Sequence, residues 1–131
     1  MRVGYGIGEP DLIAAINQSR PPFNCNSLGQ VAGAAALGDT EFLERSRQLV
    51  ARQIPDLREG FEKFGCQTWP SQTNFVLVDF KQPFDPIYPK FLAEGVILRP
   101  MTGYGLPNCA RVNIGTDAEH ERLWAACEKI L

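Results

Sequence analysis

Two apolar, strand-like runs flank a rigid loop in residues 97–116, ILRPMTGYGLPNCARVNIGT. The loop, residues 101–108, contains two glycines that permit unusual backbone angles and a proline that stiffens its exit. Arg99 abuts the first run and Arg111 begins the second. This arrangement predicts two neighbouring strands with a permanent positive charge at the edge of each.

The rest of the second half mixes helices and strands. A helix is predicted through Phe64, ended by Gly65, because apolar side chains recur there at helical spacing. Thr116 and Glu119 form a capping box that opens a terminal helix. The remaining elements are predicted as strands 66–69, 74–80, 96–99 and 111–115 and a short helix over 86–94. The order α-β-β-α-β-β-α predicts an α+β fold, a small sheet covered by helices on one face.

The first part of the chain has a different character. RVGYGIG, residues 2–8, is interpreted as a short strand or strand end, and a helix is predicted over 11–20. Ser27 and Gln30 have the spacing of a capping box before the alanine-rich helix VAGAAAL. The small side chains of that helix indicate close packing against another element.

Composition excludes several classes of function. The 131 residues suit one domain, and a net charge of −2 does not provide the basic surface that a nucleic-acid-binding protein needs. The apolar runs are too short to span a bilayer, and the N-terminus has no signal-peptide pattern, so we expect no membrane partner and a cytoplasmic location. Four cysteines without CxxC spacing are expected to be reduced and mostly buried. With one histidine, His120, expected on a helix surface, no metal site is predicted.

The arginines are the strongest candidates for binding chemistry. Each guanidinium can hold a carboxylate or a phosphate by two parallel hydrogen bonds, so Arg99 and Arg111 would form an anion clamp if both left the sheet on the same side. Tyr104 adds a phenol from the loop. The alternative is that both arginines are structural, paired with acidic side chains or exposed at a sheet edge. Asn74 is either a turn residue or a ligand contact.

Four stretches together resemble the histidinol-phosphate aminotransferase family of fold-type I, pyridoxal-phosphate-dependent enzymes. They are PPFNCNSLGQVAGAAAL, DTEFLERSR, PSQTNFVLVDF and GVILRPMTGYGLPNCARVNIGT. The last stretch is the most specific. The resemblance implies the C-terminal portion of such an enzyme, with a small, mostly antiparallel sheet covered by helices. The implied reaction is amino transfer between histidinol phosphate and 2-oxoglutarate or glutamate in histidine biosynthesis.

The resemblance also implies roles for individual residues. Arg111 would hold the anionic end of the substrate, and Arg99 would assist with phosphate or carboxylate. Tyr104 and Asn74 are further candidates for substrate contacts from their residue types and positions, not from the resemblance. Arg2 would contact the phosphate of the cofactor. Family members are homodimers, so a homodimer is the implied assembly.

The catalytic lysine of the family has no counterpart in the chain. It lies eight residues before the arginine matched by Arg2, so no catalytic residue is assigned. The lysines at 63, 81, 90 and 129 have unrelated surroundings. We therefore expect that the isolated chain does not bind pyridoxal phosphate stably and has no transaminase activity.

The resemblance divides the chain into two parts. Residues 1–38 would be a remnant of the large cofactor domain and its connection, with exposed apolar faces that favour self-association or disorder. Residues 39–131 would be the small C-terminal domain. Two other interpretations within the fold are a phosphothreonine decarboxylase and an aromatic aminotransferase; outside it, the chain could be a non-catalytic anion-binding or assembly module.

Overall fold

The structure is a computed structural model that describes residues 2–131. The chain forms two compact units that divide between Glu44 and Arg45. The family resemblance predicts a different boundary, between residues 38 and 39, where the remnant of the large cofactor domain would meet the small domain. That boundary stays a prediction. No helix in the described part of the chain is long and apolar enough to cross a membrane.

The first unit contains α1 (Pro10–Ser19), α2 (Ser27–Leu37) and the start of α3 (Thr40–Lys63). Both predicted helices are confirmed. The strand predicted over residues 2–8 is wrong, because that segment pairs with no other strand among the described residues and has no regular structure. The cap of α2 also differs from the prediction: Asn26, not Ser27, is the N-cap, and its side chain accepts a hydrogen bond from the Gly29 N–H at 2.6 Å.

The first unit buries very little of its apolar surface. Among residues 2–44, only Gly29 is buried. Large apolar side chains are exposed instead, including those of Tyr5, Ile7, Leu12, Ile16 and Phe23. The exposed apolar faces expected from the sequence are therefore present.

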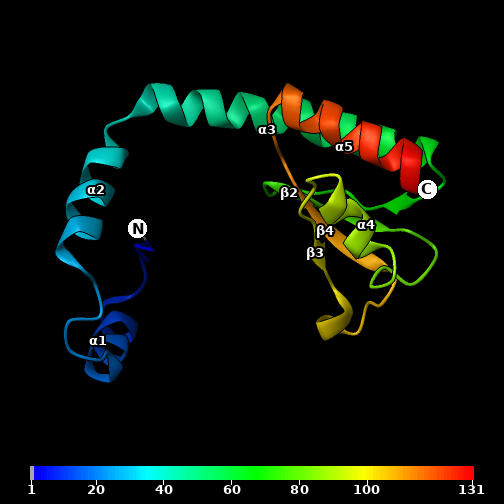
Figure 1. Cartoon of the computed structure of the whole chain (residues 1–131). Helices are drawn as coiled ribbons and strands as arrows, with labels where there is room; N and C mark the ends of the chain where they lie inside the picture. The colour runs from blue at the N-terminus through cyan, green and yellow to red at the C-terminus, as the bar shows by residue number, and fades with distance from the viewer. Residues whose placement is uncertain (1) are drawn as a thin grey trace. The chain divides into compact units, whose positions relative to one another are not determined.

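The second unit is the predicted α+β fold. Its strands are β1 (Gln67–Thr68), β2 (Phe75–Asp79), β3 (Arg99–Pro100) and β4 (Cys109–Asn113), and all neighbours in the order β1-β2-β4-β3 are antiparallel. The later part of α3, α4 (Tyr88–Ala93) and α5 (Asp117–Ile130) complete the unit. Figure 1 shows α5 and the end of α3 side by side over one face of the sheet.

The core lies between these helices and the sheet. Alternation along β2 sends Val76 and Val78 inward, where both are fully buried. Phe61 of α3 packs edge-on against Trp124 of α5, with ring centroids 5.2 Å apart. The other fully buried large side chains are Leu57, Phe84, Phe91, Val112 and Cys127. The helices thus cover one face of the sheet and leave the other to carry a site.

The capping box predicts the start of the terminal helix correctly, whereas the predicted ends of the strands are less accurate. The capping box is present: the Thr116 N–H donates to Glu119 at 2.7 Å, and Thr116 Oγ1 accepts from the Glu119 N–H. The last two strands begin and end at different residues from those predicted, 99–100 instead of 96–99 and 109–113 instead of 111–115. The short helix begins at Tyr88 rather than at residue 86.

Candidate functional site

Arg99 and Arg111 are direct partners across the β3–β4 ladder. Residues opposite each other in an antiparallel pair project from the same face of the sheet, with Cβ atoms about 4.5–5.5 Å apart. The two side chains therefore leave the sheet on one side, as an anion clamp requires. We refer to these two residues as the arginine pair.

The arginine pair lies on the face of the sheet that the helices leave open. Val112 and Ala110, on either side of Arg111, are buried on the helix face. Leu77 of β2 is opposite Arg111 and is half-buried, in contrast to its buried neighbours Val76 and Val78. Alternation along both strands thus places Arg111 and Leu77 together on the open face.

Arg111 is the more enclosed member of the pair. Its side chain is half-buried, and its Nε is fully buried with no hydrogen-bond partner. The guanidinium carbon lies 5.1 Å from the centroid of the Phe75 ring, within the range of a cation–π contact. An unpaired buried donor is costly, so this arrangement is one that folding alone would not favour.

Arg99 is exposed and is held from the loop. Its Nη2 donates a hydrogen bond to the Tyr104 hydroxyl at 3.2 Å, and its guanidinium lies 5.9 Å from the centroid of the Tyr104 ring. Tyr104 ends a short 3₁₀ helix, Thr102–Tyr104, and Gly105 follows with φ 77°, a value that suits glycine. The loop therefore brings the predicted phenol to the predicted arginine.

Neither arginine has an acidic partner among residues 2–131. The ion pairs Arg52–Asp117, Lys81–Asp79 and Lys129–Glu94 involve neither of them. Asp79 shares the open face, diagonally from Arg111, but its carboxylate bonds to Lys81. The structure does not show either arginine in an ion pair, but Arg99 is exposed on the edge strand β3, as the other part of the structural alternative expected. Two like charges face each other instead, and an anion between them would relieve that repulsion.

The other two predicted contacts lie elsewhere. Asn74 is exposed, and its carbonyl accepts a hydrogen bond from the Ile114 N–H. It lines a cavity of about 620 Å³ beside α3, to which neither arginine contributes. Arg2 is exposed, belongs to the first unit and has φ 53°. Their ligand roles stay predictions.

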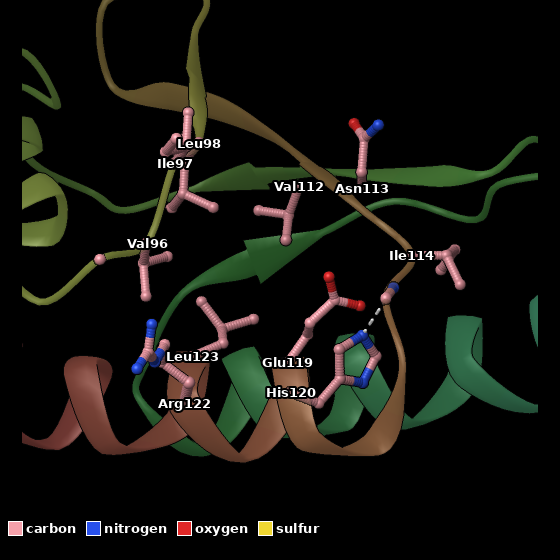
Figure 2. Close-up of a pocket in the computed structure, with 12 residues that line it drawn as sticks. Val96, Ile97, Leu98, Val112, Asn113, Ile114, Glu119, His120, Arg122 and Leu123 are labelled. Carbon is pink, nitrogen blue, oxygen red and sulfur yellow. Dashed lines mark hydrogen bonds between the residues drawn. The ribbon is translucent and has the colours of Figure 1, made fainter.

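A second cavity, of about 380 Å³, opens where the segment before β3 is no longer paired with β4 (Figure 2). The β3–β4 register would next pair Leu98 with Val112 and then Ile97 with Asn113, but the ladder stops at Arg99. Figure 2 shows Val112 directed toward α5 and Asn113 directed away from it. The arginine pair does not line this cavity, which has an apolar wall and a helix wall formed by Glu119, His120, Arg122 and Leu123.

His120 is buried, and its predicted position on the helix surface is wrong. The side chain is 6% exposed, and Nε2 accepts a hydrogen bond from the Gly115 N–H at 3.2 Å (Figure 2). Burial lowers the pKa of the imidazole, although the nearby carboxylates of Asp117, Asp56 and Glu119 oppose that shift. His120 is therefore a neutral structural acceptor. No cluster of three metal-ligating side chains occurs in the described residues.

Phe75 is the residue of the site that sequence reasoning missed. It begins β2, and the sequence predicts it only as part of the strand over 74–80. The register places it opposite Asn113 and diagonal to Arg111 on the open face. The sequence NFVLVDF shows which side chains of the strand share a face. That Phe75 lies beside Arg111 depends on strand pairing, which no local pattern specifies.

Comparison with known proteins places these features in a family. The family model described as "Aminotransferase class I and II" matches residues 1–130. A histidinol-phosphate aminotransferase of Mannheimia succiniciproducens is 41% identical over the whole chain, and one of Nitrosococcus oceani is 45% identical. The chain spans 36% and 35% of the lengths of these two relatives, respectively.

The fold matches a solved structure of the same kind. The histidinol-phosphate aminotransferase of Sinorhizobium meliloti, solved in complex with pyridoxal-5'-phosphate, superimposes with a TM-score of 0.77 and 26% sequence identity. The match covers 92% of this chain and 34% of that one. The sheet and helices described above are therefore those of a fold-type I aminotransferase.

Proposed function

This chain belongs to the class I and II aminotransferase family, and we propose that it is the part of a histidinol-phosphate-type aminotransferase that binds the anionic end of the substrate. In this proposal the chain corresponds to the C-terminal portion of the enzyme. The complete enzyme would transfer an amino group between histidinol phosphate and 2-oxoglutarate or glutamate, in the cytoplasm.

The observation that carries the proposal is the unpaired state of Arg111. A buried, charged side chain is normally compensated by a carboxylate or by hydrogen bonds. Arg111 has a buried Nε without a partner and no acidic neighbour bonded to it among the described residues. Arg99 faces it directly. A doubly positive site without internal neutralisation is suited to an anionic ligand.

One site of this kind can serve two different substrates. A phosphate monoester and a carboxylate both present oxygens that accept paired N–H donors from a guanidinium. Arg111 would hold either group, and the more exposed Arg99 would add a second positive charge beside it. Holding the anion fixes the distance and orientation of the rest of the substrate, which is how such a contact contributes to rate.

The surroundings of the lysines support the expectation that the isolated chain does not bind pyridoxal phosphate stably. All four lysines are exposed, and none of them lines the cavities of about 380 and 620 Å³ described above. Lys81 and Lys129 are paired with Asp79 and Glu94. Arg2 is the one residue for which the family resemblance suggests a cofactor contact. We therefore propose that the 131-residue chain does not catalyse transamination by itself.

Calorimetric titration of the chain with inorganic phosphate and with glutamate tests the proposal. Both should bind, and Arg111→Met should weaken each affinity at least about tenfold, since a charge-assisted hydrogen bond contributes about 1.5–3 kcal/mol. Arg122→Met is the matched control, because Arg122 is an exposed arginine on α5, away from the pair. Equal affinities for wild type and Arg111→Met would refute the proposed role.

A further inference from the structure

We infer that Phe75 is a positioning residue, whose ring fixes the guanidinium plane of Arg111 so that the anion is bound end-on by the two Nη groups. This inference rests on the proposed function, because it concerns how the same site is held ready.

The ring and the guanidinium are brought together by strand register. Leu77 is opposite Arg111 and Phe75 is opposite Asn113, so Phe75 is the diagonal neighbour of Arg111 on the open face. Aromatic side chains reach diagonal partners across a sheet. The guanidinium carbon lies 5.1 Å from the ring centroid, and both side chains are half-buried.

No other polar contact fixes the orientation of Arg111 among residues 2–131. Its Nε has no hydrogen-bond partner, and no carboxylate is paired with it. Arg99 differs, because Tyr104 gives it a hydrogen bond as well as a ring contact. The Phe75 ring is therefore the contact that restricts the rotation of the Arg111 guanidinium before any ligand arrives, and such restriction reduces the entropic cost of binding.

The burial of Nε determines which edge of the guanidinium is available. A carboxylate or phosphate can bind side-on, through Nε and one Nη, or end-on, through both Nη groups. The Nε atom is inaccessible to solvent, so the side-on edge is blocked. With the ring against the guanidinium face, the end-on edge is left for the anion.

Titration with inorganic phosphate and glutamate compares Phe75→Leu with Phe75→Tyr in the 131-residue chain. Leucine keeps an apolar side chain without a π face, and tyrosine keeps the ring. We expect Phe75→Leu to weaken binding roughly 3- to 30-fold, the range that corresponds to a cation–π contact, and Phe75→Tyr to bind within about twofold of wild type.

Graded fluorination of the ring separates positioning from packing. Replacing Phe75 with fluorinated phenylalanines preserves shape while it weakens the negative face of the ring. Affinity should fall stepwise with the number of fluorine atoms, while the thermal unfolding midpoint stays nearly constant. The Arg111 Nε–Hε resonance, identified by its loss in Arg111→Met, should shift with fluorination before any anion is added. If Phe75→Leu does not fold, the fluorinated variants still test the positioning role of Phe75.

The outcomes distinguish the two proposals. If Arg111→Met loses affinity but Phe75→Leu and the fluorinated variants bind like wild type, the positioning role is refuted and the anion site stands. If Arg111→Met binds like wild type, the anion site itself is refuted.

Discussion

The side chains of Arg99 and Arg111 face each other across the β3–β4 ladder, two positive charges in direct register with no carboxylate bonded to either in the described part of the chain. Like charges in this position destabilise a sheet by up to about 1 kcal/mol. A ligand that carries negative charge reverses that effect.

Lysine cannot replace Arg111. Arg111→Lys keeps the charge but loses the planar fork, so phosphate binding should weaken by about 1.5–3 kcal/mol. Calorimetric titration at constant ionic strength measures the change, and a circular-dichroism spectrum shows whether the variant is folded. Retained affinity in a folded Arg111→Lys protein would favour a purely structural role.

The two arginines should act on one anion. If they share a ligand, Arg99→Met and Arg111→Met are coupled in a double-mutant cycle, with an interaction free energy of about 0.5–3 kcal/mol for phosphate binding. Arg99→Met alone should have the smaller effect, because Arg99 is exposed and its charge is screened by salt. Additive effects in the cycle would mean two separate sites.

A methyl group at Gly60 should destabilise the second unit. Gly60 lies in α3 against the indole of Trp124, and a Cβ there would approach Trp124 Cζ2 to 2.5 Å. Alanine normally favours a helix, but overpacking of this kind costs about 1–3 kcal/mol. Urea denaturation of Gly60→Ala should therefore show a lower free energy of unfolding. Gly103→Ala is the control, since nothing lies within 4 Å of its Cβ position, and it should be nearly neutral.

Stability should fall as the pH drops from about 7 to 5. Burial lowers the pKa of His120 below its ordinary value of 6.5, so the unfolded chain binds a proton at a higher pH than the folded chain does. The contribution of neutral His120 is complete above pH 6.5 and is lost as the pH falls toward the folded-state pKa. Urea midpoints across this range measure the slope.

His120→Gln is the control for this slope. Glutamine keeps an acceptor for the Gly115 N–H but does not titrate, so its profile should be flatter between pH 7 and 5. Glu119 acts in a lower window: hydrogen bonds from Thr116 lower its pKa from 4.5, so its contribution is present above pH 4.5 and is lost below that value. A wild-type slope in His120→Gln would contradict the assignment to His120.

One thiol of the four should react in the folded chain. Burial raises the pKa of Cys66 to about 11 and that of Cys127 to about 12, and it also raises the pKa of the buried Cys109. Cys25 is exposed. Iodoacetamide at pH 8, followed by mass spectrometry, should label Cys25 rapidly and the others only after denaturation, because the thiolate is the nucleophile. Rapid native labelling of Cys127 would show that α5 does not pack as described.

Elements with a local cause were predictable from the sequence. The cap at Thr116 and the end of α3 before Gly65 follow from side chains a few residues away. The position of His120 was also readable: it precedes Leu123 and Cys127 by three and seven residues, so all three lie on one helix stripe. Its polarity led to the wrong expectation.

Elements that depend on distant partners were less predictable. The limits of β3 and β4 are set by pairing with each other and with β2, so their ends differ from those predicted. Residues 2–8 contain strand-forming side chains but find no partner among the described residues. The arginine pair was recognised by residue type, yet whether the two shared a face depended on register, which the sequence pattern left open.

The ladder between β3 and β4 restricts how the connecting loop can vary in length. Side chains along a strand alternate in direction, so sliding β3 by one position would turn Arg99 toward the helices while Arg111 stayed in place. If one residue is inserted or deleted in 101–108, the loop must change its conformation without shifting the register, or Arg99 and Arg111 will no longer lie opposite each other. Homologous chains that use both arginines should therefore tolerate substitutions in this loop far more readily than changes in its length.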